Sequence, residues 1–320
     1  MKNIIDKYQG AFIGLAIGDT LGMSVEFEDP KDFEPLTEPI AGGTFDLPLG
    51  YWTDDTSMAL CLADSLLEKG GYDSFDVMDK YWVWWSDGYR SSTGACFDIG
   101  NQTVACLEEY KSGGKAVIPK NKDRTFDAGN GSVMRLAPLI IASHSAGNSL
   151  EETMELSRIS GRETHYSFMA EASTALFGAM IFNAFEAKEK EEIFDLGLYK
   201  ITDDLGELIN ALKTAKEQDP SNLKTGGYVL DSLVCAVWSF LNNATFESGA
   251  LAVVNLGGDS DTNGAIYGQL AGAYYGIDSI PEEWKKILHL ESEISDLAIR
   301  LGNMKSCKVI QTRFEEDEQG

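Results

Sequence analysis

The chain is organised around the stretch Gly257-Gly258-Asp259-Ser260-Asp261-Thr262-Asn263-Gly264-Ala265, which an apolar run from residue 266 to residue 275 follows. Two carboxylates and a threonine hydroxyl lie within four positions of this turn. Glycines let the backbone fold sharply there, so the side-chain oxygens can face a common point. Hard divalent cations prefer such oxygen ligands. The stretch therefore predicts a cation site where a helix begins.

A second acidic cluster, Thr53-Asp54-Asp55-Thr56, lies far upstream, after a loop that contains Gly42, Gly43 and Gly50. An apolar helical pattern follows this cluster as well. Either cluster alone offers too few ligands for a closed cation site. We therefore predict that the two clusters form the two halves of one metal centre.

A calcium hand and simple helix capping both account for these clusters less well than a metal centre does. A calcium hand would match residues 259–264, but it requires a bidentate glutamate at its twelfth position, where this chain has Leu270. Helix capping would also use Asp, Ser and Thr near the positive end of a helix. One cap needs only one such residue, so adjacent carboxylates that repel each other favour a metal site.

The remaining sequence predicts an all-α fold, a compact single-domain orthogonal helical bundle. Strand patterns bounded by hairpin signals are absent. Small residues at Gly10, Gly14 and Gly18 allow the first helix to approach another closely. We expect residues 1–313 to form the domain and 314–320 a disordered acidic tail. The expected helices cover residues 4–21, 57–67, 75–85, 170–185, the segment from the turn at 226–228 to 241, 246–254 and 266–275.

Composition limits the partners of the chain. It has 320 residues and a net charge of −25, which argues against a nucleic-acid partner because no basic face is present. Five cysteines, an odd number without a CxxC pair, are expected to be buried free thiols in a reducing cytosol. No apolar run reaches the roughly twenty residues that span a bilayer. These features predict a cytoplasmic protein without a membrane segment.

Three motifs carry a resemblance to a known family. TDDT at 53–56, GGDSDTNGA with YGQLAGAYYG at 257–276, and GLAIGDTLGMSVEF at 14–27 resemble the ADP-ribosylglycohydrolase family. Within it, the chain is most similar to the dinitrogenase reductase-activating glycohydrolases and ADP-ribosylarginine hydrolases. The resemblance covers residues 10–284. It implies two Mg²⁺ or Mn²⁺ ions as cofactors. The implied ligands are Thr53, Asp54, Asp55, Asp259, Asp261 and Thr262.

The resemblance also implies residues that act on the substrate. Asp98 of the DIGN segment at 98–101 would lie at the scissile bond, although local sequence alone slightly favours a simple helix cap. Glu26 would reach the site from a loop rich in proline and glycine. The implied contacts with ADP-ribose are Gly129, Asn130, Gly131, Ser132, Met134, His165 and Tyr228. For His165 and Tyr228, a role in the core is an equal alternative, and Arg135 could bind a phosphate or a structural carboxylate.

The implied reaction is the hydrolysis of the glycosidic bond between ADP-ribose and an ADP-ribosylated protein or small molecule, with arginine favoured by the DIGN segment. Asp98 heads a predicted helix, whose dipole favours its ionised form and suits a base or charge stabiliser. Glu26 would then gate the substrate. Two alternatives stay open: a two-metal phosphoester or pyrophosphate hydrolase, and a non-catalytic, crystallin-like ADP-ribose-binding descendant. The presence of all implied ligands argues against the second.

Overall fold

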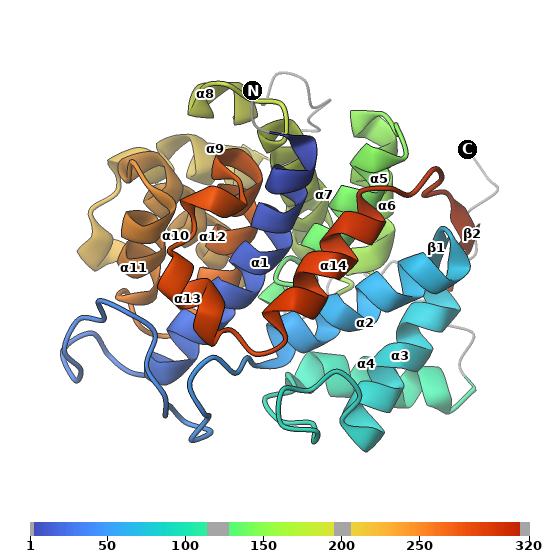
Figure 1. Cartoon of the computed structure of the whole chain (residues 1–320), viewed down its shortest axis with the longest axis horizontal. Helices are drawn as coiled ribbons and strands as arrows, with labels where there is room; N and C mark the ends of the chain where they lie inside the picture. Colours follow the sequence, from blue (N-terminus) through green and yellow to red (C-terminus); the bar gives the residue numbers. More distant parts are fainter. Residues whose placement is uncertain (1–2, 114–127, 195–205, 314–320) are drawn as a thin grey trace.

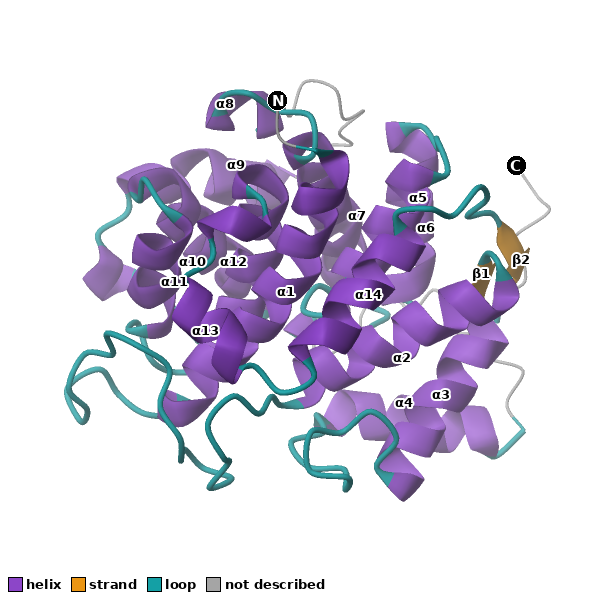
Figure 2. Cartoon of the chain, viewed as in Figure 1, coloured by secondary structure: helices purple, strands orange, loops and turns teal. Residues whose placement is uncertain are grey.

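The computed structural model describes residues 3–113, 128–194 and 206–313, and helices dominate this part of the chain (Figure 1, Figure 2). The predicted all-α class is confirmed. The predicted tail at 314–320 lies outside the described residues, and the single-domain boundary stays a prediction. The helices are α1 (Ile4–Gly22), α2 (Asp54–Lys69), α3 (Ser74–Asp87), α4 (Asn101–Lys111), α5 (Ala137–Ser145), α6 (Leu150–Gly161), α7 (Phe168–Ala184), α8 (Lys190–Ile193), α9 (Gly206–Thr214), α10 (Val229–Asn242), α11 (Phe246–Val254), α12 (Ser260–Tyr275), α13 (Glu282–Ile287) and α14 (Glu291–Leu301).

Helices α1 and α12 form the central antiparallel pair. Gly10, Gly14 and Gly18 of α1 face Gly272, Gly268 and Gly264 of α12, one glycine pair per turn. A methyl group at Gly18 would lie only 2.0 Å from the carbonyl oxygen of Gly264. The two backbones therefore touch directly, as the spacing of small residues predicts.

The other helices surround this pair. In Figure 1, α10 and α11 lie on one side of α1, and α2, α5 and α14 lie on the other. Buried apolar side chains from both sides join in one core cluster. Within the described ranges, every helix is too short or too polar to span a bilayer.

A short parallel strand pair is the exception to the helical fold. Strand β1 (Tyr72–Asp73) pairs with β2 (Val309–Gln311), and the Gln311 amide donates a hydrogen bond to Asp73 Oδ1 at 2.8 Å. Asp73 also caps α3. Strands of two and three residues leave no alternating pattern, which explains why the sequence did not predict them.

Two helices begin earlier than the apolar periodicity indicates. Helix α2 starts at Asp54 rather than at residue 57, and α12 starts at Ser260 rather than at 266. The acidic clusters therefore lie in the first turns of these helices, where apolar periodicity gives no signal. The side chains of the two acidic clusters are therefore attached to a rigid helical backbone.

All five cysteines are free thiols. Four are buried, and Cys96 is half-buried on the loop before α4. The prediction of free thiols is confirmed, although Cys96 is an exception to the prediction of burial.

Candidate active site

Asp19 of α1 fixes the first turn of α2. Its Oδ1 accepts hydrogen bonds from the backbone N–H and the hydroxyl of Thr53, both at 2.9 Å. Its Oδ2 accepts the N–H and hydroxyl of Thr56, at 3.0 and 2.6 Å. These bonds satisfy the donors at the start of the helix. Asp54 and Asp55 are therefore not needed as caps.

The two acidic clusters meet at this point of the fold. The Thr53 hydroxyl lies 3.3 Å from Asp55 Oδ2 and 3.0 Å from Asp261 Oδ2, although 208 positions separate Thr53 and Asp261 in the chain. The Thr262 hydroxyl lies 3.4 Å from Asp55 Oδ2. The structure thus brings together oxygens from the first turns of α2 and α12, as the sequence predicts.

Asp259 stands at the cap position of α12 without acting as a cap, because its side chain accepts no N–H from the helix. Its Oδ2 instead accepts a hydrogen bond from the Asn130 amide at 2.8 Å. Its backbone N–H donates to the Thr225 carbonyl oxygen at 2.7 Å. Capping therefore does not explain the acidic residues of this turn either.

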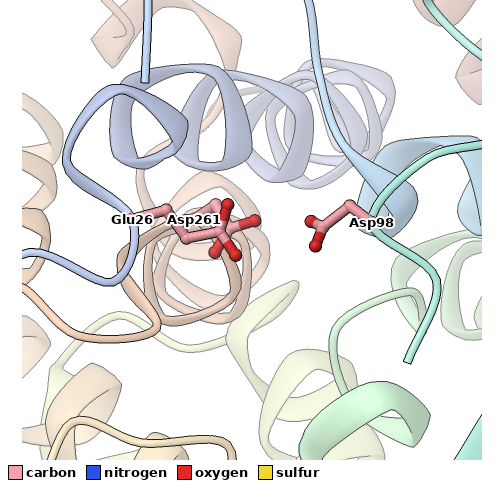
Figure 3. A group of neighbouring side chains, drawn as sticks. All are labelled: Glu26, Asp98 and Asp261. Carbon is pink, nitrogen blue, oxygen red and sulfur yellow. The ribbon is translucent and has the colours of Figure 1, made fainter. Parts of the chain in front are cut away.

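Glu26, Asp98 and Asp261 face one another across the site. Each offers a carboxylate oxygen within 4.8 Å of the others. Figure 3 shows Glu26 beside Asp261, with Asp98 approaching from the opposite side on a separate loop. The two carboxylates predicted to be catalytic thus lie close to the predicted metal ligands.

Burial raises the proton affinity of these groups. It is the main cause of pKa values of about 9 for Glu26 and about 8 for Asp98, and neighbouring carboxylates add to it. Burial, with the same repulsion, raises the pKa values of Asp54, Asp55 and Asp261 well above the ordinary range. The cluster therefore needs either protons or cations to be stable.

The donor set fits hard cations. Glu26 Oε2, Asp55 Oδ1 and Asp261 Oδ1 are buried acceptors without a hydrogen-bond partner. Among the described residues, no lysine or arginine forms an ion pair with these carboxylates. Buried charge of one sign requires a counter-charge, and oxygen-only ligands suit Mg²⁺, Mn²⁺ or Ca²⁺ rather than zinc. A cation bound among these oxygens would supply that charge.

A glycine turn lies beside Asp259. The Asn130 N–H donates to the Gly227 carbonyl oxygen at 3.0 Å, and the Val229 N–H donates to the Ala128 carbonyl oxygen at 2.9 Å. These bonds join the turn to the start of α10, where Tyr228 is 38% exposed. Tyr228 is therefore a rim residue rather than the core tyrosine that was its alternative.

Side chains beneath the glycine turn support it from inside. The ring of buried His165 fills the space beside Gly131, because a methyl group added to that glycine would lie 2.6 Å from the ring. Burial is the main cause of the low pKa of His165, about 3, which keeps the ring neutral. Arg135 donates to the carbonyl oxygen of Gly131 and the hydroxyl of Thr164, both at 2.7 Å. The partners of Arg135 among the described residues are therefore neutral groups rather than the structural carboxylate expected as one alternative, and its contact with a phosphate stays a prediction.

Two other residues of this segment turn inward. Ser132 is buried and its hydroxyl accepts a hydrogen bond from Thr174 of α7 at 2.7 Å, and the side chain of Met134 is buried too. Helix α5 begins at Ala137, beyond the turn, and its first N–H donates to Gln269 at 2.7 Å. The glycine turn is therefore not the anion-binding start of that helix. Contact of Ser132 and Met134 with ADP-ribose stays a prediction.

A family model for ADP-ribosylglycohydrolases matches residues 1–308. The chain belongs to the ADP-ribosylglycohydrolase family. The ADP-ribosylarginine hydrolase Tri1 of Serratia proteamaculans is 37% identical over 93% of this chain and 79% of its own length. The ADP-ribosyl-[dinitrogen reductase] glycohydrolase of Rhodospirillum rubrum is 30% identical over 91% of this chain and 93% of its own length.

A solved structure agrees with the family assignment. It is described as an ADP-ribosylglycohydrolase-related protein complex and shares 37% sequence identity with this chain. The match has a TM-score of 0.79 and covers 96% of this chain and 100% of the other. The family resemblance seen in the sequence is confirmed.

The structure corrects two expectations about Asp98 and Glu26, the residues predicted to be catalytic. Asp98 is no helix cap, because α4 starts at Asn101 after Gly100 and Asp98 has a positive φ of 57° outside the helix. Burial favours its protonated form, against the expected effect of the dipole. Glu26 is only 3% exposed, and the Phe27 N–H donates to the Gly258 carbonyl oxygen at 2.6 Å. Glu26 is therefore fixed rather than carried on a free loop.

Asp19 is the site residue that sequence reasoning missed. It is fully buried within α1, a helix whose neighbouring residues are almost all apolar or glycine. A lone aspartate in such a run is itself a signal, because a buried carboxylate requires partners. Those partners lie 34 and 37 positions away, at Thr53 and Thr56, so no local pattern identifies them.

Proposed function

We propose that this chain is a metal-dependent hydrolase that removes ADP-ribose from arginine side chains of proteins by cleaving the N-glycosidic bond. The observation that carries this proposal is the convergence of buried, unpartnered carboxylate oxygens from α2, α12 and the loop of Glu26, with the Asp98 carboxylate of a second loop within 4.8 Å of Glu26 and Asp261. Family membership supports glycosidic cleavage. The Serratia and Pseudomonas relatives named as ADP-ribosylarginine hydrolases support arginine as the acceptor.

We propose two Mg²⁺ or Mn²⁺ ions as cofactors. Bound ions would offset the repulsion among the buried carboxylates, orient the ribose hydroxyls and polarise a water molecule. The residues that would hold the ions are Thr53, Asp54, Asp55, Asp259, Asp261 and Thr262. Glu26 and Asp98 lie close enough to Asp261 to join this set.

The side chains of the site suit the transition state of glycosidic cleavage. That state resembles an oxocarbenium ion, which nearby negative charge stabilises. The aspartates of α2 and α12 supply this charge, and Asp98 and Glu26 on opposite sides could each carry a proton. We assign Asp98 to the scissile bond and Glu26 to positioning of the substrate hydroxyls.

The glycine turn and Tyr228 are proposed to bind the nucleotide. Gly129, Asn130 and Gly131 form a turn whose position is fixed from both sides, by the start of α10 and by His165, and Gly129 is its half-buried member. Tyr228 offers an exposed ring at the rim for stacking. Its hydroxyl keeps its proton, because burial raises its pKa.

We further propose that the enzyme acts in the cytosol on ADP-ribosylated proteins. The free thiols support a reducing compartment. The net charge of −25 opposes binding to nucleic acid. Fractionation of cells that express a tagged chain would test the location, and recovery in an oxidising compartment would contradict it.

The decisive experiment is incubation with peptides that carry ADP-ribose on arginine or on serine, with Mg²⁺, Mn²⁺, Zn²⁺ or a chelator. We expect free ADP-ribose from the arginine peptide, dependent on Mg²⁺ or Mn²⁺. Release of AMP would indicate pyrophosphate cleavage instead. Faster cleavage of the serine peptide would overturn the choice of acceptor but not the glycosidic reaction.

A further inference from the structure

The loop that carries Asp98 has an unusual anchoring residue. Residues 88–100 connect α3 with α4, and Arg90 near their start has a left-handed φ of 62°. This conformation is uncommon for long side chains and costs free energy that other contacts must offset. The contacts of the Arg90 side chain must therefore offset this cost.

Arg90 binds two helices at once. Its Nε and Nη2 donate to the two oxygens of Asp64 of α2, at 2.6 and 2.8 Å, and Nη1 donates to Glu293 of α14 at 2.5 Å. The Tyr89 hydroxyl donates to the same Asp64 carboxylate at 2.8 Å. The side chains of Arg90 and Asp64 are only 18% and 10% exposed, so solvent screens this forked pair weakly.

Internal contacts brace the same loop from Gly88 to Ala95, three residues before Asp98. Ser91 and Thr93 donate from their hydroxyls to the Ala95 carbonyl oxygen, at 2.6 and 3.0 Å. Gly88 packs so closely on Gly94 that a methyl group would lie 2.1 Å from the Gly94 carbonyl oxygen. A shift of Arg90 would therefore be passed along the loop to Asp98.

Helix α2 both carries predicted metal ligands and binds the loop at residues 88–100. Asp54 and Asp55 lie in its first turn, and Asp64 lies nine residues further on, about 14 Å along the axis. A second tie joins the loop to the same region, because the Ser92 hydroxyl donates to the Trp52 carbonyl oxygen at 2.6 Å. The position of the loop that carries Asp98 is thus fixed relative to α2, the helix that carries the predicted metal ligands Asp54 and Asp55.

We propose that Arg90 is a positioning residue for catalysis: its fork on Asp64, with its bond to Glu293, sets the place of the Asp98 carboxylate opposite Glu26. Arg90 itself does not reach the reacting atoms. The proposal rests on the role assigned to Asp98 above. Small displacements of a catalytic group reduce rates strongly, whereas distant contacts with the nucleotide would be unaffected.

The test compares Arg90→Gln with Arg158→Gln. Arg158 also joins two acids, Glu155 at 2.5 Å and Glu171 at 3.2 Å, between α6 and α7 and away from the site. We expect Arg90→Gln to lower kcat on the arginine-linked peptide by roughly ten- to a hundredfold, with KM and ADP-ribose affinity within about twofold of wild type. Arg158→Gln should keep wild-type kcat.

Two further variants make the test independent of folding. Arg90→Lys keeps the charge but loses the fork, and we expect an intermediate kcat. In an Asp98→Asn background, Arg90→Gln should cause little additional loss, because it acts through the missing carboxylate. Calorimetry should show that every Arg90 variant still binds Mg²⁺, so that a loss of kcat cannot be attributed to unfolding.

Several outcomes would overturn the proposal. A wild-type kcat in Arg90→Gln would contradict it. In the double variant of Arg90→Gln and Asp98→Asn, a loss of kcat equal to the product of the two single losses would also contradict it. Equal losses of kcat in Arg90→Gln and Arg158→Gln would do the same. Near wild-type kcat in Asp98→Asn alone would overturn both this proposal and the role of Asp98. Absence of ADP-ribose release by the wild type would instead reject the proposed function.

Discussion

At the scale of single residues, the two carboxylates that face each other differ in how they are fixed. Asp98 reaches the site from a braced loop outside any helix, and Glu26 follows a short 3₁₀ turn (Met23–Val25) after α1. Both are held in place, as catalysis requires, and the DIGN segment is what assigns Asp98 rather than Glu26 to the scissile bond. We expect Asp98→Asn to lower kcat about a hundredfold or more while ADP-ribose binding is retained. Steady-state kinetics and calorimetry with ADP-ribose check this.

Glu26 is expected to act on both binding and turnover. It lies beside Asp261, where a substrate hydroxyl or a cation can be shared (Figure 3). Glu26→Gln should therefore raise KM and lower kcat together. A Glu26 variant without activity but with normal ADP-ribose binding, next to a nearly normal Asp98 variant, would show that the two roles are exchanged.

Individual residues were predictable where their chemistry appears in adjacent positions. Three oxygen side chains in four positions indicate a cation site without any knowledge of the fold, and their convergence was predicted on that ground. Asp19 and Arg135 were not predictable, because each takes its role from partners placed by the packing of distant helices. The inward direction of Ser132 has the same cause, since only α7 shows which side is the core.

At the scale of elements, the contact between α1 and α12 leaves no room for a side chain. We expect Gly18→Ala to lower the free energy of unfolding by about 3 kcal/mol or more, since backbone atoms would have to move apart. Gly206→Ala is the control, because a methyl group there meets no atom within 4 Å. Urea unfolding at saturating Mg²⁺ measures both. Equal stability of the two variants would show that the helices separate easily.

The buried carboxylate of Glu163 after α6 makes stability depend on pH. Its Oε1 accepts hydrogen bonds from Tyr72, at 3.1 Å, and from Ser74. Burial, partly offset by Ser74 and Arg313, raises its pKa from 4.5 to about 7. The folded state therefore binds more protons than the unfolded state within this window, and stability falls as the pH rises through it.

Glu163→Gln should remove that loss. The unfolding free energy of the variant minus that of the wild type should increase by up to about 3 kcal/mol as the pH rises from about 4.5 to about 8. The exposed Glu151→Gln serves as the control for the loss of one charge. Urea unfolding at both pH values, with Mg²⁺ present, measures the shift, and an unchanged difference would contradict the assignment.

Helices were predicted better in their apolar middles than at their starts. The periodicity of α7, α10 and α11 placed these helices to within about two residues. The starts of α2 and α12 were missed because their first turns consist of buried polar residues, which apolar periodicity counts as loop. The functional residues are thus the cause of the error, and such local inconsistency is common at sites.

At the scale of the whole molecule, the fold gathers acidic groups from both ends of the chain around one point. Burial of several like charges opposes folding unless cations or protons compensate them. Cations that bind only the folded state should therefore stabilise it according to their concentration. Activity and stability then depend on the same ions.

We expect Mg²⁺ at about a hundred times its dissociation constant to raise the Tm of the wild type by about 5 °C over its value in chelator. Asp261→Asn removes one ligand and one buried charge. Its Tm should exceed that of the wild type in chelator, because the raised pKa of Asp261 means that its charge opposes folding, and its gain from Mg²⁺ should be less than half as large. Asp32→Asn, which removes an exposed charge, should behave like the wild type in both conditions. A wild-type response to Mg²⁺ in Asp261→Asn would exclude Asp261 as a ligand.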